Sequence, residues 1–152
     1  MRRICLGLCI WRVMIAPNGQ PVELAGCRIL GRLPPRELSK WYGRAAIYAL
    51  PARYEPFGLS VLEAALSGCA LVLGDIESLR ETWGDAAVFV PPDDHAKLTG
   101  ALRELMSDPR RREALARRSA ARAKSFTPEL MAADYLDAYG AAVGLRRMAC
   151  VL

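Results

Sequence analysis

The feature that most constrains the fold is a series of short apolar segments without polar alternation. They occupy residues 46–50, 70–73 and 87–90, and a proline or glycine follows each one directly. Strands covered on both faces read as continuous apolar runs, whereas strands with one face in water alternate. Helix-like stretches separate the three segments. The pattern therefore predicts an α/β fold, a parallel sheet with helices on both faces.

Turn and capping residues place the other elements. A further strand is expected over 27–30, and helices over 34–43, 58–67 and 78–83. Three helices in succession are expected to end the fold, over about 94–106, 109–124 and 128–139, with Asp93 or Asp94, Asp108 and Thr127 before their starts. We divide the chain into an N-terminal segment, 1–26, a folded domain, 27–143, and a tail, 144–152.

Composition excludes several classes of protein. The chain has 152 residues with 53% apolar content, which fits one globular domain and not a disordered chain. Its five cysteines form no Cys-x-x-Cys pair and its one histidine is His95, so neither a zinc site nor a disulfide framework is expected.

The chain has an excess of basic residues, with 21 Lys and Arg against 16 Asp and Glu. This excess indicates anionic partners but does not identify which kind. Six arginines cluster in the predicted helix 109–124, but no aromatic residues for base stacking lie among them. We therefore interpret them as a solvated helix surface and expect no nucleic-acid partner. These arginines are Arg110, Arg111, Arg112, Arg117, Arg118 and Arg122.

The first residues have the charge-then-apolar order of a signal peptide. No small-x-small cleavage site follows, and the apolar run is too short to span a bilayer before Arg12 interrupts it. The alternative is a buried strand at 13–16, ended by turn residues. We favour the strand, and expect a cytoplasmic protein.

The segment between the strand 46–50 and the next helix is the candidate site. In an open parallel sheet, ligands bind where the carboxyl ends of the strands meet the following helices. A glycine at the helix start lets a ligand approach the backbone closely. The amides of Gly58, Leu59 and Ser60 are expected to point at an anion such as a phosphate, which the helix dipole also favours.

Two carboxylates, Glu55 and Glu63, flank those amides. If Leu59, Leu62 and Leu66 form the apolar stripe of the helix, Glu63 borders the buried face, where a carboxylate needs hydrogen-bond donors such as ribose hydroxyls. Two alternatives stay open on spacing alone. Glu55 favours a helix N-terminus in any case, and Glu63 can pair with a surface arginine.

The sequence that contains this segment resembles the donor-binding domain of the retaining GT-B-fold glycosyltransferases of the family-four group, also called group 1. That group includes bacterial mannosyl-, glucosyl- and glycogen-synthase-like enzymes. The resemblance runs from about residue 29 to 139. Its markers are Leu30-Gly31-Arg32-Leu33-Pro34, Tyr54-Glu55-Pro56-Phe57-Gly58-Leu59, Leu62-Glu63-Ala64, Gly84-Asp85-Ala86-Ala87, Val90-Pro91-Pro92-Asp93 and Phe126-Thr127-Pro128.

The resemblance implies a Rossmann-like sheet that forms half of a GT-B fold, and a nucleoside-diphosphate sugar as substrate with no metal and no other cofactor. Glu55 would act as the catalytic residue and contact the transferred sugar. The amides of Phe57, Gly58 and Leu59 would bind sugar hydroxyls and phosphate, and Glu63 the ribose. The strand end at Leu30 and Gly31 would lie against the base. In the isolated chain, a non-catalytic nucleotide-binding module or a structural remnant remains an alternative.

Two departures accompany the resemblance. The family commonly has a glycine pair where this chain has Ile76-Glu77-Ser78, which leaves the identity of the donor open. The family's acceptor domain, and the Arg and Lys that neutralise the diphosphate, also match no residues here. We therefore expect part of a longer enzyme, inactive by itself. The missing N-terminal acceptor domain or a dimer partner would pack on the last helix, through Leu130, Met131, Tyr135 and Leu136. Peripheral membrane association of the full enzyme stays open.

Overall fold

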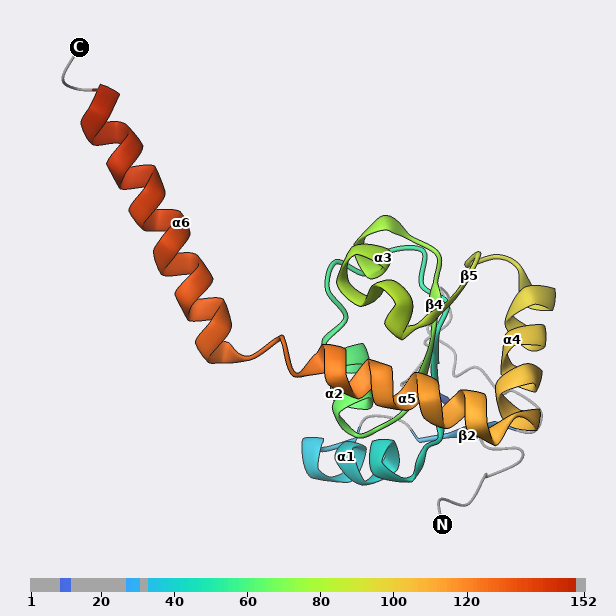
Figure 1. Ribbon diagram of the computed structural model, residues 1–152. Helices are drawn as coiled ribbons and strands as arrows, with labels where there is room; N and C mark the ends of the chain where they lie inside the picture. Colours follow the sequence, from blue (N-terminus) through green and yellow to red (C-terminus); the bar gives the residue numbers. More distant parts are fainter. Residues whose placement is uncertain (1–8, 12–26, 31–32, 150–152) are drawn as a thin grey trace, which may run out of the picture.

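The computed structural model describes residues 9–11, 27–30 and 33–149 (Figure 1). The strand predicted at 13–16 lies outside these residues, and so does Gly31. None of the described helices is both long and apolar enough to cross a membrane.

All strand pairs in the described chain are parallel, which confirms the predicted sheet type. Strand β1 (Cys9–Trp11) pairs with β2 (Cys27–Ile29). A second sheet has the order β3-β4-β5, formed by Ile47–Leu50, Ala70–Gly74 and Val88–Val90. In its register Leu50 lies beside Leu73, and Gly74 beside Val90, so the three strands end along a common edge.

The helices follow the predicted order. They are α1 (Pro35–Arg44), α2 (Leu59–Leu66), α3 (Glu77–Trp83), the 3₁₀ turn η1 (Gly84–Ala86), α4 (His95–Ser107), α5 (Pro109–Ala123) and α6 (Pro128–Ala149). Asp94 and Asp108 cap α4 and α5 as expected, since their carboxylates accept hydrogen bonds from the N–H groups of Lys97 and Arg111.

The predicted end of the last helix, near Tyr139, is wrong. Helix α6 continues to Ala149 and includes part of the segment that we assigned to the tail. Gly140 and Gly144 lie within it, because a single glycine in a helix costs only about 1 kcal/mol relative to alanine. The alanines that surround them are strong helix formers.

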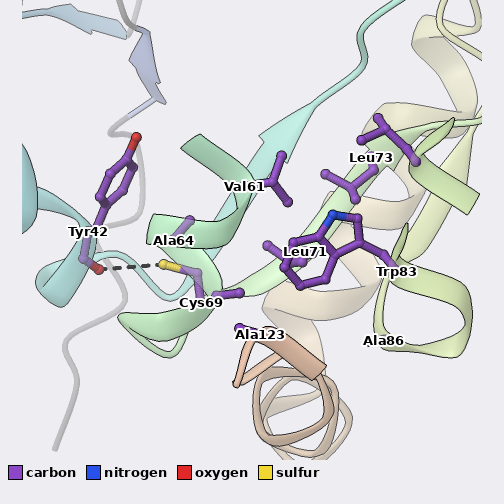
Figure 2. Packing of buried hydrophobic residues seen from close by; sticks show 11 residues of the cluster. Tyr42, Val61, Ala64, Cys69, Leu71, Leu73, Trp83, Ala86 and Ala123 are labelled. Atoms are coloured by element: carbon purple, nitrogen blue, oxygen red, sulfur yellow. Dashed lines mark hydrogen bonds between the residues drawn. The ribbon is translucent and has the colours of Figure 1, made fainter. Parts of the chain in front are cut away.

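Strand β4 lies between two apolar clusters. Leu71 and Leu73 face α1, α2, α3 and η1, and Figure 2 shows this side, with the Cys69 thiol donating to the Tyr42 carbonyl at 3.4 Å. Ala70 and Val72 face α4 and α5 on the opposite side. Every residue of β4 is buried, as the continuous apolar run predicts.

Helix α5 joins the two sides, since Leu115 belongs to one cluster and Ala123 to the other. One of its six arginines departs from the predicted solvated surface. Arg112 is buried, with 7% of its surface exposed, and its guanidinium donates to the Leu105 carbonyl at 2.8 Å. That bond ties the end of α4 to α5, so Arg112 is structural.

Helix α6 extends away from the sheet and its covering helices (Figure 1). Each of its residues from 128 to 144 is exposed, including Met131, Tyr135, Leu136 and Tyr139. The apolar face on which we expect a partner to pack is therefore exposed in the described chain.

Candidate functional site

Charged side chains follow each strand of the β3-β4-β5 sheet at its carboxyl edge. Arg53 and Glu55 come after β3, Asp75 after β4 and Asp93 after β5. Arg53 forms an ion pair with Asp93, which links the loop after β3 to the loop after β5. Ligands of open parallel sheets bind at this edge, and the predicted segment lies along it.

The corner that starts α2, residues 55–60, has a specific backbone conformation. Gly58 is the residue before the helix and has φ 82° and ψ 61°, in the left-handed region. A Cβ at this position would lie 2.8 Å from Cγ2 of Val61, so the corner requires glycine for both reasons. We name residues 55–60 the Gly58 corner.

Glu55 bends back onto this corner. Its Oε1 accepts a hydrogen bond from the Gly58 N–H at 2.9 Å. The Gly58 carbonyl then accepts the first helical bonds, from the N–H groups of Val61 and Leu62. Of the three amides predicted to face an anion, Gly58 is thus engaged by Glu55. The amides of Leu59 and Ser60 precede the first bonded turn and lie at the positive end of the helix.

The predicted apolar stripe of α2 is wrong for Leu59 and Leu66, whereas Leu62 is half-buried and packs against the core. Leu59 and Leu66 are 68% and 57% exposed, and the buried residues are Val61, Ala64 and Ala65. The helix packs closely against the sheet, so small side chains occupy its buried face. The prediction had assigned the larger leucines to that face. Glu63 is consequently exposed, so its carboxylate needs no donors to offset burial.

The remaining predicted residues have different surroundings. The Phe57 ring packs edge-on against Phe126, with ring centroids 5.5 Å apart, so its side chain anchors the corner and leaves its amide as the predicted contact. The Ser60 hydroxyl accepts a hydrogen bond from the Tyr48 hydroxyl at 2.8 Å. Leu30 is half-buried after β2.

The structure also reveals anchors that sequence reasoning missed. A Cβ on Gly74 would lie 2.3 Å from the Ala52 carbonyl oxygen, so the backbone of the loop after β3 touches the end of β4. The Ser78 hydroxyl donates to the Glu55 carbonyl at 2.7 Å. The sequence signal for the contact from Ser78 was that residues 76–78 depart from the glycine pair common in the family.

Arg80 and Asp75 form a two-pronged ion pair beside the corner. Hydrogen bonds from the Arg80 guanidinium lower the pKa of the Asp75 carboxyl. The same guanidinium lies 4.8 Å from the centroid of the Phe89 ring, which fixes α3 against β5. Among the described residues, no group of three His, Cys, Asp or Glu side chains is arranged to hold a metal ion.

A surface hollow of about 440 Å³ lies elsewhere, at the amino ends of β3 and β4. Ala46, Gly68 and several residues of α5 line it. Because the Gly58 corner lies at the carboxyl edge, this hollow is not the predicted donor site.

Comparison with known proteins decides the family. The profile of the family described as glycosyl transferases group 1 matches residues 22–122, two thirds of the chain, and this range includes the whole Gly58 corner. The chain belongs to the group 1 glycosyl transferases. The resemblance inferred from the sequence is therefore confirmed.

Relatives of this group 1 glycosyl transferase include O-antigen chain mannosyltransferase B of Escherichia coli, 33% identical over 112 residues, covering 74% of this chain and 29% of that protein. Glycogen synthase of Mycobacterium tuberculosis is 41% identical over 88 residues, covering 57% and 21%. The chain thus spans less than a third of the length of these relatives.

Solved structures confirm the fold. Sucrose-phosphate synthase from Thermosynechococcus elongatus aligns with a TM-score of 0.69 at 24% identity, over 78% of this chain and 31% of that one. Anabaena HepE, solved in complex with UDP-glucose, aligns with a TM-score of 0.61 at 18% identity, over 66% and 28%. This group 1 glycosyl transferase thus shares the GT-B-type α/β fold.

Proposed function

We propose that this chain is the donor-binding domain of an enzyme that moves a hexose from a nucleoside diphosphate to an acceptor hydroxyl with retained anomeric configuration. The observation that carries the proposal is the Gly58 corner, where the Glu55 carboxylate bonds to the Gly58 N–H at 2.9 Å at the start of α2. The family match over residues 22–122 and the complex of Anabaena HepE with UDP-glucose support it.

The corner offers separate groups for separate parts of the donor. One oxygen of Glu55 is held by the Gly58 N–H. In the proposed complex its other oxygen accepts from a hydroxyl of the sugar. The amides of Leu59 and Ser60 bind the diphosphate at the positive end of α2. The exposed Glu63 accepts from the vicinal hydroxyls of the ribose, and the base lies against Leu30.

In this reaction the bond between the anomeric carbon and the diphosphate oxygen breaks while the acceptor oxygen bonds on the same face. The acceptor's proton passes to the departing diphosphate. Negative charge develops on the leaving group, and fixed amides aimed at that charge stabilise it without reorganisation. We propose that the reaction needs only the nucleotide sugar and the acceptor, with no metal and no cofactor.

Calorimetry with UDP, GDP, ADP and their glucose and mannose conjugates tests the proposal. We expect the wild-type chain to bind at least one nucleotide sugar, and Glu63→Ala to weaken that binding about tenfold or more, because hydrogen bonds to a charged group are lost. Glu113→Ala, which removes an exposed carboxylate of α5, is the matched control and should bind normally. No binding of any of the nine ligands would contradict the proposal and leave a structural remnant.

Turnover by the chain alone is a separate question. We propose that it transfers no sugar, because the cationic pair and the acceptor-binding surface implied by the resemblance match no residues of this sequence. The apolar face of α6 would then be covered by an acceptor domain or by a second copy. Release of nucleoside diphosphate with transfer to a simple glycoside acceptor would contradict this.

A further inference from the structure

We propose that Ser78 is a positioning residue that sets how tightly the site holds the sugar part of its donor, acting through Glu55. The inference rests on the proposed function. It starts from one contact, the hydrogen bond of 2.7 Å from the Ser78 hydroxyl to the Glu55 carbonyl. Ser78 lies on α3, so the bond joins two segments that are 23 residues apart in the sequence.

The hydrogen bond from Ser78 holds the backbone of Glu55, whose carboxylate is proposed to contact the sugar. Glu55 bends its carboxylate back to the Gly58 N–H, and that geometry requires the Glu55 backbone to stay at a fixed place relative to the start of α2. Upstream, the loop is fixed where Ala52 packs on Gly74. Between these two points, Ser78 supplies the hydrogen bond from α3. Without it the half-buried Glu55 carbonyl loses this donor and the turn is free to shift.

Helix α3 is itself rigidly placed, so Ser78 transmits a fixed position. The neighbouring Leu79 is fully buried in the cluster beside β4. Arg80 is bound to Asp75 at the end of β4 and lies over the Phe89 ring of β5. The Thr82 hydroxyl donates to the Ser78 carbonyl at 2.8 Å. The Ser78 hydroxyl therefore ties the Glu55 backbone to α3 and the core of the sheet, in addition to the Ala52–Gly74 contact and the packing of Phe57 on Phe126.

The contact is specific to the side chain at this position. A glycine at 78 has no hydroxyl to donate, and neither has an alanine. In the proposed site Glu55 binds the sugar, and the amides of Leu59 and Ser60 bind the phosphates. Loss of the Ser78 bond should therefore weaken the sugar contact and spare the diphosphate contact. This asymmetry separates a positioning role from a general loss of structure.

The test uses the full chain and the variants Ser78→Ala, Ser78→Thr and Ser107→Ala. Ser107 is a matched control, since its hydroxyl also bonds to a backbone carbonyl, at Glu104, on an exposed helix end. The first readout needs no ligand. The protection of the Gly58 amide against hydrogen exchange reports its bond to the Glu55 carboxylate, so this protection should fall in Ser78→Ala and persist in Ser78→Thr and Ser107→Ala.

The second readout is calorimetry with the nucleotide sugar that binds the wild type and with the matching nucleoside diphosphate. Ser78→Ala should weaken the nucleotide sugar about tenfold, the effect of one lost hydrogen bond, and leave the nucleoside diphosphate within about twofold. Ser78→Thr should restore the wild-type ratio. Unchanged protection of the Gly58 amide in Ser78→Ala, or equal weakening of both ligands, would overturn the inference.

The two readouts also separate this inference from the proposed function. If the wild type binds no nucleotide sugar, the proposed function fails and the selectivity claim fails with it. If the wild type binds one while Ser78→Ala keeps the wild-type ratio of affinities, only the role of Ser78 is overturned.

Discussion

At the scale of single residues, the candidate site depends on one glycine in an unusual conformation. Gly58 has φ 82°, where a side chain costs about 1–2 kcal/mol, and its Cβ would meet the Val61 side chain. Gly58→Ala should therefore lower the free energy of unfolding by about 1–2 kcal/mol or more, measured by urea denaturation.

Gly100→Ala is the matched control for that substitution. Gly100 lies in α4, and a Cβ there would meet nothing within 4 Å. The alanine should raise the free energy of unfolding by about 0.5–1 kcal/mol, because glycine is a poorer helix residue. If both variants changed stability in the same direction, the left-handed conformation assigned to Gly58 would be wrong.

At the scale of elements, the orientation of α2 is the feature that sequence reasoning misjudged, and a pair of substitutions tests it. Val61 is fully buried, so Val61→Ala should lower the free energy of unfolding by about 2 kcal/mol. Leu59→Ala should change it by less than about 0.5 kcal/mol, since Leu59 is 68% exposed. Thermal or urea unfolding of both variants measures the difference, and the reverse ranking would restore the predicted stripe.

The elements differ in how far the sequence predicts them, for physical reasons. Strand β4 was predictable because a strand buried on both faces must be apolar throughout, and α4 and α5 because Asp94 and Asp108 cap them. The face of α2 was not, because close packing selects Val61, Ala64 and Ala65 over larger leucines. The position of the Gly58 corner followed from its motif. The contact from Ser78 did not, since nothing local marks a partner 23 residues away.

At the scale of the whole molecule, the two parts of the chain differ in what holds them. The β3-β4-β5 sheet has apolar clusters on both faces, and α5 contributes to each, so this body should unfold as one unit. Helix α6 has exposed side chains from 128 to 144, and its Tyr135 and Tyr139 rings stack only with each other among the described aromatic contacts. Helices without tertiary packing are marginal in water.

Because of this exposure, hydrogen exchange in α6 can show whether a partner covers its apolar face. In hydrogen–deuterium exchange, its amides should exchange orders of magnitude faster than those of β4, which open only with the whole body. A partner that binds the apolar face of α6 will slow the exchange of the α6 amides without changing the exchange rate of the β4 amides. Protection that grows with protein concentration would identify a second copy as the cover, whereas slow exchange in a dilute sample would contradict the exposed helix.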